Sequence, residues 1–116
     1  MNTIAEHVEQ AAEQLRAANH ATHDDPLDGP SAAVVVGNLR ELVARLPQLL
    51  DHLRRSARRA DFAAHYDDRP GVPVVRTFGF AMDHLDDSRH LADALHDQLA
   101  AAHNDLGHIG RHFVED

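Results

Sequence analysis

The chain has 116 residues, close to the usual size of one domain, so residues 1–116 are expected to share one hydrophobic core. Its 19 acidic residues outnumber 11 arginines, with no lysine, and the formal net charge of −8 disfavours binding to nucleic acids and anionic membranes. The absence of cysteine excludes a disulfide framework, a thiolate metal site and a cysteine nucleophile.

Residues 3 to 22 are predicted to form the first helix, because apolar side chains recur at alternating spacings of four and three residues. These side chains are Ile4, Val8, Ala11, Leu15 and Ala18. Thr3 and Glu6 match a capping box and predict the start of the helix. Two prolines and a glycine within residues 23–30 predict the first turn.

The second helix is predicted after Ser31, which is placed to act as its N-cap. Its apolar positions alternate between spacings of three and four, and they are Val36, Leu39, Val43, Leu46, Leu50, Leu53, Ala57, Ala60 and Ala64. Pro47 interrupts this stretch and must either kink the helix or begin a new one. Because the heptad phase continues across Pro47, a kink is favoured. Residues 67–73 predict the second turn.

The third helix has the longest heptad pattern. Its positions are Phe78, Ala81, Leu85, Ser88, Ala92, Leu95, Leu99, Ala102, Leu106, Ile109 and Phe113. Met82 and Leu91 widen this stripe, as expected for a helix that touches more than one neighbour. Residues 33–37 and 72–80 are rich in β-branched or aromatic side chains, so short strands are the alternative there. Gly37 and Gly79 are interpreted as points of close helix approach or as a frayed first turn.

These patterns predict an all-α fold, an antiparallel bundle of three to four helices. At about 1.5 Å per residue, the first helix spans roughly 30 Å and the other two roughly 50 Å each, so the first cannot cover both. The remaining apolar surface must be covered by folding back at Pro47 or by a second copy of the chain. A four-helix monomer and a symmetric homodimer are the two solutions, and the homodimer is favoured.

A divalent-metal site is one functional hypothesis. Asp105, His108 and His112 have the spacing that stacks three ligands on one helix face. The alternative is a polar flank of the last helix, frayed by Gly107 and Gly110, and this reading carries more weight. No established metal-binding motif accompanies the three residues, so the expected cofactor is none.

A basic patch is formed by Arg54, Arg55, Arg58 and Arg59. Such a patch suits phosphate or an acidic partner, but pairing with the Asp-rich third segment of the same chain is the more ordinary interpretation. The negative net charge and the lack of interleaved aromatic residues make nucleic acid an unlikely partner.

The sequence contains no nucleophile elbow, phosphate-binding loop or dinucleotide fingerprint, so we expect a non-enzymatic interaction module that self-associates or binds a protein partner. The expected contact residues are Leu46, Leu50, Leu53, Leu85, Leu95 and Leu99. No signal peptide and no apolar run of membrane-spanning length are present, so a cytoplasmic location without membrane contact is expected.

Overall fold

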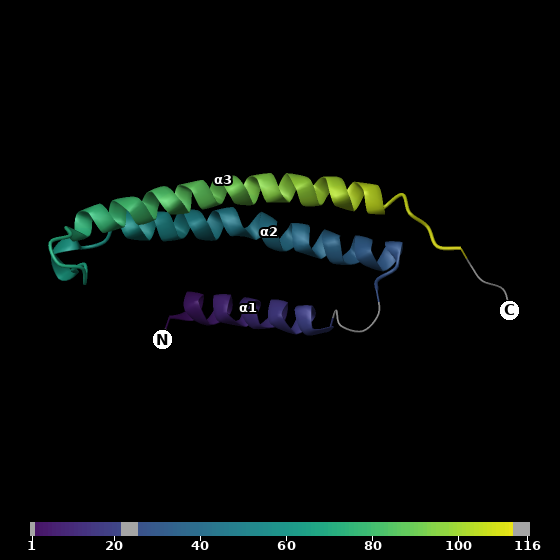
Figure 1. Ribbon diagram of the computed structural model, residues 1–116, viewed down its shortest axis with the longest axis horizontal. Helices are drawn as coiled ribbons and strands as arrows, with labels where there is room; N and C mark the ends of the chain where they lie inside the picture. Colours follow the sequence, from purple (N-terminus) through teal and green to yellow (C-terminus); the bar gives the residue numbers. More distant parts are fainter. Residues whose placement is uncertain (1, 22–25, 113–116) are drawn as a thin grey trace.

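The computed structural model describes residues 2–21 and 26–112. This part of the chain forms three α-helices, α1 (Thr3–Ala21), α2 (Gly29–Arg58) and α3 (Val74–Leu106), and a short 3-10 helix, η1 (Phe62–Ala64) (Figure 1). No strand occurs among the described residues, so the helical interpretation of residues 33–37 and of the segment that begins α3 is confirmed. The predicted all-α class is correct.

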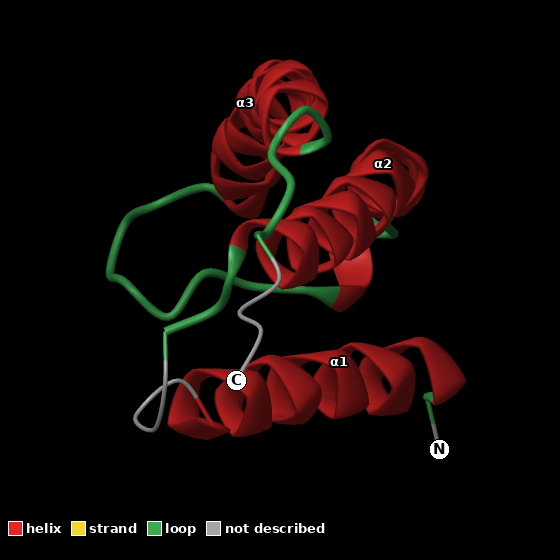
Figure 2. Cartoon of the chain, turned by 90° about the vertical axis from the view of Figure 1, so that its right-hand side faces the viewer, coloured by secondary structure: helices red, strands yellow, loops and turns green. Residues whose placement is uncertain are grey.

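The helices are arranged as a long antiparallel hairpin with one further helix beside it. α2 and α3 pack against each other along their lengths, whereas α1 runs antiparallel to α2 on the side away from α3 (Figures 1 and 2). The molecule measures 73 × 26 × 24 Å along its principal axes. It is therefore an elongated hairpin with a loosely associated helix.

Two helix starts differ from the sequence prediction. The Asn2 side chain accepts hydrogen bonds from the backbone amides of Ile4 (3.0 Å) and Ala5 (3.3 Å), so Asn2 caps α1 and the predicted Thr3–Glu6 capping box is wrong. At α2, the Asp28 carboxylate accepts a bond of 2.8 Å from the backbone amide of Ser31. Asp28 is therefore the N-cap and Ser31 lies inside the helix, because a cap must precede the first helical residue.

Pro47 lies inside α2, which continues without interruption from Gly29 to Arg58. The alternative in which a new helix begins at Pro47 is therefore wrong, while the kink stays a prediction. Since α2 does not fold back, the four-helix monomer is not formed by the described residues. The apolar surface of α2 and α3 that α1 is too short to cover therefore remains exposed in the single chain.

Both long helices end before their heptad patterns do. α2 ends at Arg58, because the extended backbone of Asp61 places its carboxylate to accept a bond from the amide of Ala63 and start η1. Ala60 and Ala64 are consequently outside the helix. α3 ends at Leu106, where glycine residues disfavour continuation, so Ile109 is also outside and Phe113 lies beyond the described residues.

The hairpin has a very small core. Among the described residues only Val43 (5% exposed) and Ala92 (7%) are buried, and they come from α2 and α3. The chain exposes 9576 Å², whereas a compact monomer of 12.8 kDa exposes roughly 6,300 Å². Its radius of gyration is 20.0 Å, against about 13 Å for a compact domain of this length. The isolated chain leaves far more surface open than a finished globular domain.

Candidate interaction surface

Two contacts define the sides of α2 and α3 that face each other. Arg89 on α3 forms an ion pair of 3.1 Å with Asp51 on α2. Nearer the open end of the hairpin, a Cβ added to Gly37 would lie 3.0 Å from Nε2 of His103, so the imidazole sits directly over the glycine backbone. The predicted close approach at Gly37 is confirmed, whereas Gly79 has no neighbour within 4 Å of such a Cβ and serves no close approach.

A second apolar stripe on each helix remains exposed. On α2 it contains Val35, Leu42 and Leu53, and on α3 it contains Leu91, which is 70% exposed, and Leu95, which is 48% exposed. These side chains lie beside the positions that form the α2–α3 contact. We call this group of five residues the open face.

The two stripes lie on the same side of the hairpin. Leu42 directly precedes the buried Val43, and Leu91 directly precedes the buried Ala92. In an antiparallel helix pair, a residue that directly precedes a contact position on one helix and a residue that directly precedes one on the other helix project to the same side of the pair. Val35 precedes the half-buried Val36 in the same way. The exposed apolar side chains therefore lie on one side of the hairpin, where other turns of α3 carry polar residues such as His84 and Gln98.

α1 lies against the edge of the open face on α2. Ile4 lines a shallow hollow of about 300 Å³ together with Arg45, Gln48, Leu49, His52 and Arg55 of α2. Leu49 is half-buried and lies one heptad after Leu42, so α1 covers one turn of the α2 stripe. The other apolar side chains of α1, including Val8 and Leu15, are exposed. α1 thus lies loosely against α2, and the part of the open face on α3, Leu91 and Leu95, stays exposed.

The six leucines predicted as contact residues divide into two groups. Leu46, Leu50, Leu85 and Leu99 are half-buried within the hairpin, and Leu53 and Leu95 lie on the open face. Sequence reasoning placed Leu91 in a widened stripe but did not assign it to the surface, and it left out Val35 and Leu42. All three residues share one sequence signal: each is an apolar residue that immediately precedes a position of the heptad pattern.

The basic patch remains on the surface. Arg54, Arg55, Arg58 and Arg59 are exposed, and none of them forms an ion pair within the described part of the chain. The expected pairing with the Asp-rich third helix is therefore not seen there. The expected pairing joins arginines of α2 to aspartates of α3. In the ion pair that does join the two helices, the arginine, Arg89, is on α3 and the aspartate, Asp51, is on α2.

The predicted metal ligands do not share a helix face. Asp105 lies in the last turn of α3, but the helix ends at Leu106, so His108 and His112 follow in a turn and an irregular segment. Residues 2–21 and 26–112 contain no group of three or more His, Asp or Glu that could hold a metal ion. The geometric basis of the metal hypothesis is therefore missing.

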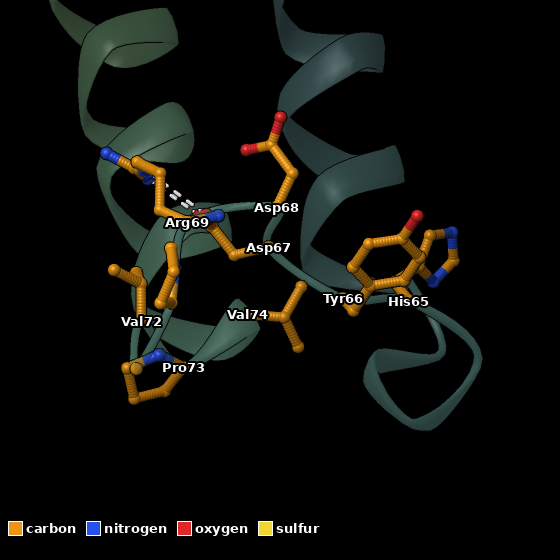
Figure 3. A pocket seen from close by; sticks show the side chains of 10 residues that line it. His65, Tyr66, Asp67, Asp68, Arg69, Val72, Pro73 and Val74 are labelled. Carbon is orange, nitrogen blue, oxygen red and sulfur yellow. Dashed lines mark hydrogen bonds and ion pairs between the residues drawn. The ribbon is translucent and has the colours of Figure 1, made fainter.

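A polar network closes the connection between α2 and α3. The Asp67 side chain, only 3% exposed, accepts bonds from the Arg69 guanidinium at 2.9 Å and 2.6 Å (Figure 3). It also accepts bonds from the Arg69 amide at 2.8 Å and from the Thr77 hydroxyl. The adjoining hollow of about 550 Å³ is lined by residues 65–74. These groups satisfy one another, so the network fastens the start of α3 to the loop.

This network predicts a loss of stability in acid. The bonds from Arg69 and then Thr77 hold the pKa of Asp67 well below its ordinary value of 3.8, and bonds from Ser31 and Arg111 lower the pKa of Asp28. A carboxyl whose pKa is lowered by folding stabilises the fold above its unfolded pKa, and this contribution is lost as the pH falls toward the folded value. We expect the melting temperature to drop as the pH is lowered below about 4.

Thermal unfolding of the wild type and of Asp67→Asn between neutral pH and pH about 2.5 tests this assignment. The variant is expected to melt at a lower temperature than the wild type at neutral pH and to lose less on acidification. Equal losses in the two proteins would show that Asp67 does not contribute.

Comparison of the chain with protein families, curated proteins and solved structures found no match. Within the described residues, no helix combines the length and the apolar character that crossing a membrane requires. The argument for function therefore rests on the open face and the charges around it.

Proposed function

We propose that the protein is a non-enzymatic helical interaction module that self-associates, and that the open face is its contact surface. The carrying observation is the apolar surface left on one side of the hairpin. Leu91 and Leu95 belong to one helix and Leu42 and Leu53 to the other, so a partner that covers this side buries both stripes together. Exposed apolar side chains gathered on one side of a helix pair are typical of a protein interaction site.

The exposed area supports a second copy as the partner. The chain exposes 9576 Å², roughly half as much again as a compact monomer of its mass. Stable homodimers often bury about 2,000–5,000 Å² in total, shared equally between the copies. Covering the open face of each chain with that of another produces a four-helix layer of two hairpins, which is a common way for amphipathic hairpins to bury their leucines.

Thermal melting at several protein concentrations tests this proposal. For a dimer whose folding is coupled to association, the melting temperature rises with concentration, because mass action favours the assembled state. We expect such a rise over a hundredfold range of concentration. A melting temperature that is independent of concentration, together with a monomeric mass throughout, would contradict the proposal.

A further inference from the structure

α1 has an apolar side that is largely unpacked in the structure. Ile4, Val8 and Leu15 recur at helical spacing on one side of the helix, and they are 40%, 47% and 40% exposed. In proteins most of the stability of a helix comes from packing its apolar side against a neighbour rather than from the intrinsic preferences of its residues. The position of α1 beside α2 therefore leaves most of its packing surface unused.

α1 is already attached at the edge of the open face. Ile4 lines a hollow with residues 45–55 of α2, and the middle of this segment is near Leu49, on the same side of α2 as Leu42. α1 runs antiparallel to α2 and lies within its length (Figure 1). A second copy that packs on this part of α2 therefore competes with α1 for it.

We propose, building on self-association through the open face, that α1 is an autoinhibitory helix that closes over the open face of its own chain. In the closed form its apolar side packs against Leu42 and Leu49 of α2 and against Leu91 and Leu95 of α3, which completes a three-helix bundle. The dimer forms from chains in which α1 has left the open face. α1 thus sets how much of the protein is able to self-associate.

The length of α1 matches the part of α2 that carries the open face. α1 has 19 residues, and the segment of α2 from Val35 to Leu53 has the same number. At about 1.5 Å per residue, each spans roughly 28 Å. One α1 helix is therefore long enough to cover the α2 part of the open face.

The ion pair within the hairpin shows which residues of α2 and α3 are level with each other. Asp51 of α2 and Arg89 of α3 are joined at 3.1 Å and mark one height along the hairpin. The two helices are antiparallel, so Leu49, two residues before Asp51, is level with Leu91, two residues after Arg89.

The apolar side chains of α1 lie at the heights that closure requires. Ile4 is already beside Leu49, and hence at about the height of Leu91. Because α1 is also antiparallel to α2, Val8 lies about four residues before Leu49 in height, which is the height of Leu95. α1 can therefore close over the open face without sliding along the hairpin.

The acidic side chains of α1 remain in water when it closes. Glu6, Glu9 and Glu13 lie on the side of the helix opposite the apolar side chains. Burying an unpaired carboxylate would be costly, and closure buries none of these three. The charge pattern of α1 is thus that of a helix with one packed side and one solvated side.

Val8→Glu tests the proposal through the dissociation constant of the dimer. A carboxylate on the apolar side of α1 disfavours the closed form, and the apparent affinity rises with the fraction of chains that are open. Both copies have to open before they pair, so this fraction enters twice, and the dissociation constant is expected to fall at least about tenfold. Leu91→Glu changes it in the opposite direction.

The matched control is Ala17→Glu. It adds the same charge at an exposed position of α1, nine residues from Val8 and therefore on the opposite side of the helix. This variant should have the dissociation constant of the wild type. If the constant of Val8→Glu is equal to that of Ala17→Glu or larger, α1 does not compete with the second copy, while self-association stands as long as Leu91→Glu dissociates the dimer.

A different result would remove self-association itself. If the wild type, Val8→Glu and Ala17→Glu are all monomeric at every concentration, the open face is not a dimer interface and α1 has no assembly to inhibit. Sedimentation of the three proteins over the same range of concentrations separates this outcome from the previous one.

Disulfide trapping detects the closed form directly, because the chain has no natural cysteine. A disulfide requires Cβ atoms roughly 3.5–4.5 Å apart, so the pair Ile4→Cys and Leu91→Cys reports contact between α1 and the open face. In dilute protein this pair should form a bond within one chain at least about tenfold faster than Glu6→Cys with Leu91→Cys, in which the α1 cysteine is on the outer side.

The oxidised Ile4→Cys and Leu91→Cys chain should keep the mass of one chain, 12.8 kDa, at every concentration, since its open face is covered. Equal rates of bond formation in the two cysteine pairs would overturn the proposal. A bond that forms between two copies instead of within one would place α1 on the partner and overturn it as well.

Discussion

Leu91→Glu is expected to dissociate the dimer. The side chain is 70% exposed in the single chain, so a monomer would tolerate the change within about 0.5 kcal/mol. In the proposed dimer both copies of Leu91 become buried, and each contributes about 1.5–3 kcal/mol. Losing both should raise the dissociation constant at least about 100-fold. Sedimentation of the variant and the wild type at matched concentrations measures this effect.

The control for Leu91→Glu is Asn104→Glu, which adds the same charge at an exposed position of α3 on the opposite side of the helix from Leu91 and Leu95. This variant should sediment as the wild type does. If Leu91→Glu instead left both the mass and the melting temperature unchanged, Leu91 would be an ordinary exposed residue and the open face would not be an interface.

Val43→Asp is expected to have a different effect, because Val43 belongs to the contact within the hairpin. It is 5% exposed and is one of two buried residues in the described chain. An unpaired carboxylate in such a position costs about 3–5 kcal/mol, a large part of the stability of a small domain. We expect the helical circular-dichroism signal to be lost or strongly reduced at every protein concentration.

The matched control is Ala44→Asp, one residue further along α2, where the side chain is exposed. It should retain the wild-type helical signal. If Val43→Asp were as stable as this control, the sides of α2 and α3 that carry Val43 and Ala92 would not hold the two helices together. The open face is defined relative to those sides, so its assignment would then fail.

The sequence predicted most of the helical structure because the signals for helices and turns are local. The heptad spacing located all three α-helices, and residues 67–73 were correctly placed in the connection between α2 and α3. Gly29 and Pro30, predicted to belong to the first turn, instead begin α2. The details that failed depend on competition between neighbours. Asn2 and Asp28 cap the helices one and three residues before the predicted caps, and Asp61 ends α2 although the apolar spacing continues through Ala64.

The open face could be predicted only in part. Leu53 and Leu95 were among the expected contact residues, but periodicity assigned them to the same stripe as Leu50 and Leu99. Which of these leucines faces α3 and which faces outward depends on how the two helices are rotated about their axes. That rotation is set by long-range contacts such as Gly37 with His103 and Asp51 with Arg89, which leave no local pattern in the sequence.

The most direct test of self-association is the native mass of the purified wild-type chain, measured by sedimentation or by native mass spectrometry over a range of concentrations. The account predicts a species of twice 12.8 kDa that dissociates on dilution and is lost in Leu91→Glu. A chain that remains at 12.8 kDa at every concentration, with a melting temperature equal to that of Leu91→Glu, would contradict it.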